Sequence, residues 1–120
     1  MSSSSRQLLM AAVKGHRRVE AVMEGFLELG LPGATVLDAR GMGQIVSKDL
    51  PIFSGFRSLF PGAGEESYLI LSVLTEEQVE EAMAMVREVC GDFAEKGTGV
   101  AFILPVTRFA GPRRFTSAVK

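Results

Sequence analysis

The stretch SYLILSVLTEEQVEEAMAMVREVC, residues 67–90, joins two hydrophobic patterns in one segment. Its first part, residues 67–74, is almost continuously apolar, which predicts a strand buried on both faces. In its second part apolar residues recur at three- and four-residue intervals, which predicts an amphipathic helix. Thr75 and Gln78 mark the boundary as a capping box, in which each side chain satisfies a backbone N–H of the other residue. The predicted buried stripe of the helix consists of Val79, Ala82, Met83, Val86 and Cys90.

A similar strand and helix are predicted near the N-terminus. Residues 8–13, LLMAAV, form a short apolar run that fits a buried strand. Residues 16–29 then carry apolar side chains at helical spacing, and Gly30 followed by Pro32 ends this helix. Its predicted buried face consists of Val19, Val22, Met23, Phe26 and Leu27.

Two further strands complete the pattern. Residues 34–40 have β-branched content without a helical period, and residues 100–104 form an apolar run limited by Pro105. The order strand, helix, strand, strand, helix, strand predicts an α+β fold of the ferredoxin-like β-α-β-β-α-β type. This fold has a four-stranded antiparallel sheet with two helices on one face. With 120 residues and 47% hydrophobic content, the chain is expected to form a single domain over residues 1–120.

Three segments lie outside this pattern. Residues 1–6 are expected to be disordered, and residues 107–120 form a C-terminal tail. Residues 44–66 form a long loop without a clear regular element. Connections of this length are uncommon in compact domains and usually have a function.

The predicted sheet has more apolar surface than its helices can cover. In the third strand Ile70 and Leu74 alternate with Leu69, Leu71 and Val73, so both faces are apolar. Two helices can cover only one of these faces. We therefore expect the other face to be covered by self-association.

The composition argues against several classes of protein. Thirteen Lys and Arg residues balance 14 Asp and Glu residues, so the chain lacks the excess of positive charge that is typical of proteins that bind nucleic acid or an anionic membrane. One cysteine, Cys90, fits a reducing cytoplasm. With His16 as the only histidine, the usual His/Cys zinc sets cannot form within one chain. The sequence contains no recognisable pattern of a catalytic nucleophile, an acid–base pair or a set of metal ligands, so we expect no catalytic residues and no enzyme activity.

Several short motifs resemble those of the PII nitrogen-regulatory proteins. Residues 12–14 (AVK) close the first strand, residues 33–36 (GATV) open the second, and residues 40–43 (RGMG) follow it. Residues 97–106 (GTGVAFILPV) resemble the Gly-x-Gly-x-Ile-Phe-x-x-Pro-Val stretch of that family. Each motif is short, but their order and spacing along residues 8–106 are together similar to those of a PII-like signalling protein.

The resemblance implies a homotrimer that binds an adenine nucleotide in clefts between subunits. It implies regulation of a partner protein, a membrane transporter or an enzyme, through the 44–66 loop. The implied effector is ADP, ATP or AMP, and no cofactor or metal is required. The implied nucleotide-binding residues are Gly33, Thr35, Gly41, Met42, Gly43, Gly97, Thr98, Gly99, Arg113 and Arg114.

The glycines of these motifs have two interpretations of equal weight. Glycine lets a backbone approach a phosphate closely and can point successive N–H groups at it. Glycine is also the commonest residue at chain breaks, so Gly41, Gly43, Gly97 and Gly99 could simply end strands.

The sequence departs from the family pattern at three positions. Val100 stands where a phosphate-contacting lysine follows the second glycine, so either Arg113 and Arg114 replace its charge or nucleotide binding is weaker. Ile45 stands near the family's magnesium- and 2-oxoglutarate-binding glutamine, so 2-oxoglutarate sensing is not assigned. The only tyrosine, Tyr68, falls in the third strand, which leaves the loop no tyrosine for nucleotidylation.

The long loop is too apolar for a solvated segment. Phe53, Phe56 and Phe60 would share one face if the segment were helical. These side chains either pack on their own trimer or form a docking surface for the partner.

Two other functions of the same fold stay open. One is a ligand-independent interaction or assembly protein, favoured by Val100 and the apolar loop. The other is a trimer similar to the divalent-cation-tolerance proteins, disfavoured by the shortage of His and Cys. An effect of any nucleotide on the protein would separate the signalling hypothesis from the first of these.

Overall fold

The computed structural model describes residues 5–31, 33–46, 65–91, 93 and 97–112. Its elements are β1 (Arg6–Lys14), α1 (His16–Glu28), β2 (Thr35–Ala39), α2 (Met42–Gln44), β3 (Ser67–Thr75), α3 (Glu76–Cys90) and β4 (Gly99–Pro105). The predicted β-α-β-β-α-β order is confirmed, and α2 is an additional single turn after β2. None of the described helices is long and apolar enough to cross a membrane.

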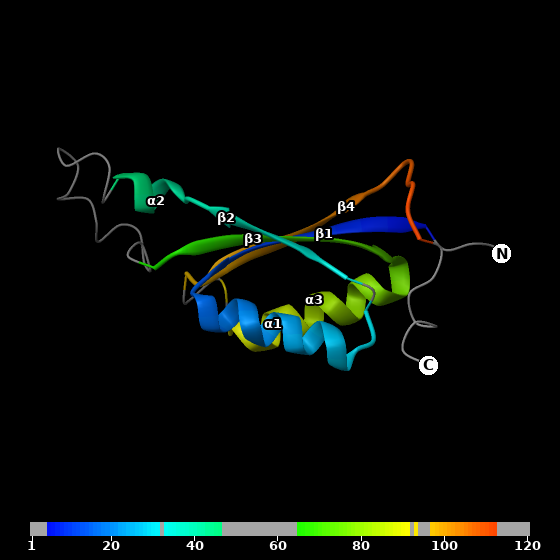
Figure 1. Cartoon of the computed structure of the whole chain (residues 1–120), viewed down its shortest axis with the longest axis horizontal. Coiled ribbons are helices and arrows are strands. Elements are labelled where there is room, and N and C mark those ends of the chain that lie inside the picture. Colours follow the sequence, from blue (N-terminus) through cyan, green and yellow to red (C-terminus); the bar gives the residue numbers. More distant parts are fainter. Residues whose placement is uncertain (1–4, 32, 47–64, 92, 94–96, 113–120) are drawn as a thin grey trace.

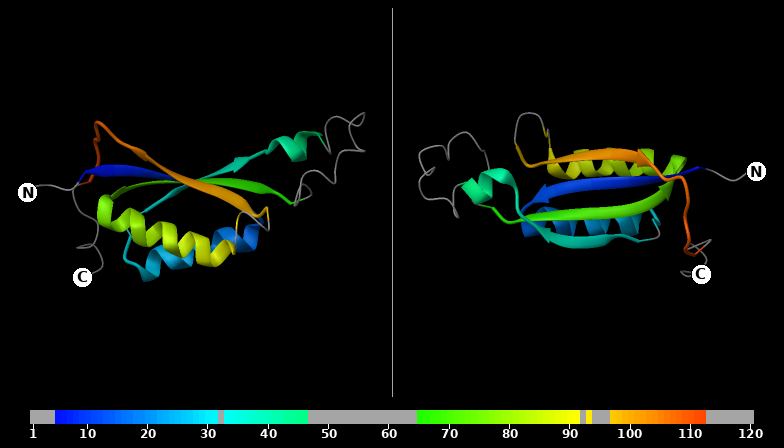
Figure 2. Two further views of the ribbon diagram at one scale, coloured as in Figure 1. Left: turned by 180° about the vertical axis from the view of Figure 1, so that it is seen from behind. Right: turned by 90° about the horizontal axis from the view of Figure 1, so that it is seen from above.

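The four strands form one antiparallel sheet in the order β2-β3-β1-β4. The first strand of the chain therefore lies in the interior of the sheet, between β3 and β4. In this register Met10 lies opposite Leu71 on one side and Phe102 on the other. Figure 1 shows α1 and α3 together below the sheet, with no helix above its centre, and Figure 2 shows the strands from the other side. The ferredoxin-like architecture is thus the one predicted.

The core lies between the sheet and the two long helices. Successive residues of a strand point to opposite faces, so alternate positions of β1 and β3 enter this layer. The strand residues Leu9, Ala11, Val13, Ile70 and Leu74 have no solvent exposure. They pack with the buried helix residues Val19, Val22, Phe26, Val79, Ala82, Val86 and Cys90.

Backbone chemistry sets the C-terminus of α1 as predicted. Gly30 adopts a left-handed φ of 70°. Its N–H donates to Leu27 O, and Leu31 N–H donates back to Phe26 O, at 3.1 and 2.9 Å. These two bonds satisfy carbonyls that the end of a helix leaves unpaired, and the left-handed turn favours glycine.

The predicted capping box at the start of α3 is confirmed. Gln78 N–H donates to Thr75 Oγ1 at 3.2 Å, and Thr75 N–H donates to Gln78 Oε1 at 3.0 Å. Gly91 follows the helix with φ 75°. The transition from β3 to α3 therefore needs no intervening loop.

Three expectations need correction. Leu27 does not share the buried face of α1 but is 79% exposed, because its position lies about 100° around the helix from Phe26. Arg6 is not disordered but begins β1, where its carbonyl accepts the Val106 N–H at 3.1 Å. Gln44 ends α2, and the helical turn continues to Val46, so the 44–66 segment begins with regular structure.

Candidate functional site

The sheet face opposite the helices is apolar and uncovered by the described chain. Its side chains follow from the register, which aligns Leu8 with Val73 and Leu104, Met10 with Leu71 and Phe102, and Ala12 with Leu69 and Val100. We call these nine residues the open face. Val100, Phe102 and Leu104 on β4 are 52%, 41% and 43% exposed. An apolar surface of this extent is typical of an interaction site.

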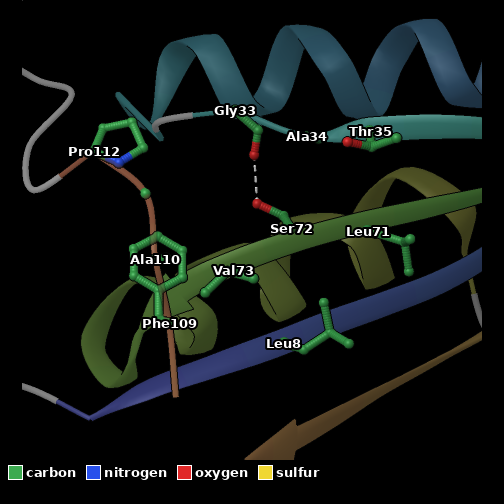
Figure 3. A pocket seen from close by; sticks show the side chains of 11 residues that line it. Leu8, Gly33, Ala34, Thr35, Leu71, Ser72, Val73, Phe109, Ala110 and Pro112 are labelled. Atoms are coloured by element: carbon green, nitrogen blue, oxygen red, sulfur yellow. Dashed lines mark hydrogen bonds between the residues drawn. The ribbon is translucent and has the colours of Figure 1, made fainter. Parts of the chain in front are cut away.

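A pocket of about 410 Å³ lies at one end of the open face. Leu8, Leu71 and Val73 form its floor, and Figure 3 shows their side chains beside the start of β2. Gly33, Ala34 and Thr35 line one side, while residues 109–112 line the other. The Ser72 hydroxyl donates to the Gly33 carbonyl and holds the entry of β2 against β3. The pocket is thus apolar, with the Thr35 hydroxyl among its few polar groups.

The segment after β4 forms the outer wall of this pocket. It runs across the ends of β1 and β3 towards the start of β2 (Figure 2). The Arg6 guanidinium carbon lies 4.6 Å from the centre of the Phe109 ring, which is a cation–π contact. The backbone then folds back at Gly111, where an added Cβ would lie 2.6 Å from the Phe109 ring.

The predicted nucleotide-binding residues do not gather at one place in a single chain. Gly33 lies at the pocket, whereas residues 41–43 lie beyond the other end of β2. Residues 97–99 lead into β4, which begins at Gly99 on the opposite edge of the sheet. Because β3 and β1 lie between β2 and β4, the two edges are about 14 Å apart at the usual strand spacing. One site containing all these groups would need a second chain.

The glycines themselves fall into two kinds. A Cβ at Gly99 would collide with the Ala12 carbonyl oxygen, so close pairing of β4 with β1 requires glycine there. Added Cβ atoms at Gly33 and Gly41 would meet no described atom within 4 Å, and neither residue has a positive φ. Nothing within the described chain therefore requires glycine at these two positions.

The remaining predicted residues are distributed as follows. Thr98 is buried, and its hydroxyl donates to the Cys90 carbonyl at 2.8 Å, which is a structural contact. Met42 is 68% exposed on α2. Val100 belongs to the open face rather than to a polar loop. Arg113 and Arg114 and the loop residues Phe53, Phe56 and Phe60 lie outside the described residues.

A smaller polar pocket of about 180 Å³ lies where the 44–66 segment joins the sheet. The Tyr68 hydroxyl donates to the Glu66 carboxylate at 2.7 Å. This bond, with some desolvation and the negative charges of Glu66 and Asp38, raises the pKa of Tyr68 above its ordinary value. Within the described ranges, no three His, Cys, Asp or Glu side chains are grouped to hold a metal ion.

The fold was compared with those of known proteins. No protein-family model and no curated protein sequence matches the chain. Among solved structures, Arabidopsis thaliana PII bound to citrate superposes with a TM-score of 0.60 and 25% sequence identity, over 87% of this chain and 79% of that one. The chain has a PII-like fold. A protein from Pediococcus pentosaceus described as functionally unknown superposes with this PII-like chain at a TM-score of 0.62, with 14% identity, over 91% of this chain and 99% of that one.

Sequence patterns missed the walls of the pocket in this PII-like chain. Leu71 and Val73 were expected on a face needing cover and Leu8 in a buried strand, whereas the part of the tail before Arg113 was assigned no role. Residues 109–112, FAGP, do carry one usable signal, because the dipeptide Gly-Pro is typical of a turn.

Proposed function

We propose that the chain is a non-catalytic, PII-like signal-transduction protein that works as a homotrimer in the cytoplasm. It senses a small effector, an adenine nucleotide, and regulates a partner protein through the 44–66 loop. The partner is a membrane transporter or an enzyme. No cofactor takes part in this function.

One observation carries the proposal: the predicted binding residues lie on both edges of a sheet whose open face is uncovered. Packing of the open faces against each other would bury Phe102 and Leu104 and bring the β2 edge of one subunit to the β4 edge of the next. Gly33 and Gly41 have open space at their Cα atoms, which suits the approach of a ligand or a neighbouring subunit. The resemblance to PII proteins supports a trimer as the assembly.

The apolar pocket suits the base of a nucleotide better than its phosphates. Its floor is aliphatic, and the Phe109 ring lies at one side. A flat heterocycle could pack on these side chains while the Thr35 hydroxyl offers a hydrogen bond, as small-molecule sites commonly combine apolar walls with few polar groups. Residues 41–43 and 97–99 lie at the other end of the strands, so those of a neighbouring subunit would supply backbone N–H groups for the phosphates.

Phosphate binding lacks one expected charge. Val100 is 52% exposed on the open face and cannot replace a lysine. We therefore propose weak nucleotide binding, or binding selective for short phosphate chains, with Arg113 and Arg114 supplying the positive charge.

Calorimetry with AMP, ADP and ATP, together with light scattering, tests this function. We expect a trimer, measurable binding and a rise in melting temperature, because a ligand that binds only the native state stabilises it. A monomer at micromolar concentration would contradict the intersubunit site. Tight ATP binding that is unchanged by Arg113→Ala with Arg114→Ala would contradict the role of the tail arginines.

The regulatory output is assigned to the 44–66 loop. Its first residue, Gln44, ends α2, which lies beyond the end of the sheet and away from α1 and α3 (Figure 1). We expect replacement of residues 46–62 by a short Gly/Ser linker to preserve the trimer and its melting temperature, because loop length changes closure entropy only slowly. Partner binding should be lost. Dissociation of the trimer would show instead that Phe53, Phe56 and Phe60 pack within the assembly.

A second function, assembly without a ligand, is favoured by Val100 and by the apolar composition of the 44–66 loop. Because this side chain extends the apolar open face where PII proteins place a lysine, the chain could assemble without any nucleotide. In that case the trimer forms, but no adenine nucleotide binds or changes its melting temperature.

A further inference from the structure

We propose that residues 106–112 form a strap that closes the apolar pocket, and that the contact between Arg6 and Phe109 is its latch. The strap contributes the outer wall of the pocket and closes over a flat heterocyclic occupant. The identity of that occupant as an adenine base rests on the function proposed above, whereas the latch does not.

The first support is the way the strap is attached. At its base the Val106 N–H donates to the Arg6 carbonyl at 3.1 Å, which continues the pairing of β4 with β1 by one residue. Beyond Val106 no described residue before 113 is part of a strand or helix. The strap therefore has a fixed hinge next to Arg6, and the rest of its course depends on side-chain contacts.

The second support is that Arg6 also holds the far part of the strap. Its guanidinium lies over the Phe109 ring at 4.6 Å from the ring centre. One residue thus provides the hinge through its carbonyl and the latch through its side chain. Such a contact at a partly exposed site is weak, so the closed and open strap can exchange.

The third support is the conformation around the ring. The backbone at Gly111 passes so close to Phe109 that a Cβ would clash with the ring. This return brings residues 110–112 into the lining of the pocket. Figure 3 shows Pro112 near Gly33 and Phe109 beside Val73. Release of Phe109 would therefore remove the whole outer wall rather than one side chain.

The strap also explains how a pocket on an apolar sheet face stays separate from the rest of that face. Leu8, Leu71 and Val73 are members of the open face, and the strap together with the start of β2 encloses their end of the sheet. In an assembly that buries the open face, this end would remain a site with its own closable wall.

A single tryptophan tests the latch without any ligand. The sequence contains no Trp, so Phe109→Trp places the only indole of the protein on the strap while preserving the cation–π contact. Acrylamide quenching of its fluorescence then measures strap opening. Arg6→Gln in this background should shift the closed-to-open ratio about two- to fivefold towards open. Arg6→Lys, which keeps the cation, should restore protection, and Arg87→Gln on the exposed side of α3 serves as the matched control.

Titration with AMP connects the latch to the pocket. In the Phe109→Trp protein AMP should reduce quenching, and Arg6→Gln should raise the AMP dissociation constant about two- to fivefold. Equal quenching with Arg6, Gln and Lys at position 6 would overturn the latch. Quenching that responds to Arg6→Gln when AMP neither binds nor protects would support the latch and contradict the proposed nucleotide function. If AMP bound and Arg6→Gln changed neither its binding nor the quenching, the nucleotide function would be supported and the latch contradicted.

Discussion

The two faces of the sheet are built from alternating residues of the same strands, yet they have opposite environments. Ile70 on the helix side is fully buried, whereas Phe102 on the open face is 41% exposed. The two faces do not differ in chemistry, because both are lined by aliphatic and aromatic side chains. They differ only in what covers them. A sheet face that stays in water usually carries polar residues at alternate positions. The open face carries apolar residues instead, which indicates that another chain covers it, because the described part of one chain does not.

The comparison separates the stability of the fold from the stability of the assembly. The helix-covered face holds the chain together, and the open face would hold chains together. Substitutions on neighbouring residues of one strand should therefore have different consequences.

The largest expected effect is the loss of assembly. Phe102→Arg places a charge on the β4 side of the open face, where burial between subunits would leave it unpaired. We expect complete conversion to a folded monomer, measured by light scattering and circular dichroism. Leu27→Arg, at a 79% exposed position on α1, should leave the assembly intact. If Phe102→Arg remained oligomeric, the open face would not be the interface.

The next effect concerns the covered face. Ile70→Ala should lower the free energy of unfolding by about 2–5 kcal/mol, because it removes a fully buried side chain and leaves a cavity. Leu69→Ala, one residue away on the open face, is the control and should cost much less when both are made in the Phe102→Arg monomer. Urea denaturation measures both. Equal losses would show that the two faces are equally important for the fold of one chain.

A smaller effect separates the two kinds of glycine. Gly99→Ala forces a Cβ against the Ala12 carbonyl and should cost about 1–3 kcal/mol, the usual range for overpacking. Gly41→Ala enters open space and should change stability by less than about 0.5 kcal/mol. Thermal unfolding of the two variants decides this. A stability loss at Gly41 as large as at Gly99 would mean that Gly41 is also required by the fold.

The smallest effect is expected at the start of α3, one of the two helices that cover the sheet. Thr75→Ala removes the side-chain acceptor for the Gln78 N–H and should cost about 1 kcal/mol. Thr75→Ser keeps that acceptor and should recover most of the loss. A cost as large in Thr75→Ser as in Thr75→Ala would exclude the cap as the cause. Assembly should be unaffected in both variants, because the change weakens only the covered side.

Local chemistry made the elements predictable from the sequence. The capping box at Thr75, the left-handed glycine at position 30 and the alternation in β3 each depend on residues that lie within one or two turns. Leu27 was predicted to be buried because a spacing of three and four residues also includes positions at the edge of the apolar face, where a side chain can be exposed to solvent.

The candidate site could not be predicted in the same way. The pocket is formed by β1, β2, β3 and the strap, which only the register brings together. Arg6 and Phe109 are 103 residues apart, as the difference between their numbers shows, and no periodic pattern links them. The resemblance to PII proteins indicated Gly33, Thr35 and the tail residues Arg113 and Arg114, but it did not indicate that residues 109–112 line a pocket.

The position of β1 in the interior of the sheet has a consequence for synthesis of the protein. This strand is made first, but its partners are β3 and β4, so its backbone pairing is complete only after Pro105. Both edges of this apolar strand stay unpaired until β3 is made, and the edge that pairs with β4 stays unpaired until residues 99–105 follow. Such pairings between distant segments fold slowly and are prone to aggregation. We expect nascent chains that end before Gly99 to be captured by chaperones and released chains ending after Pro105 to escape them, which ribosome-bound intermediates of defined length would show. The risk of aggregation during synthesis would thus arise with β1 and be relieved only when β4 is complete.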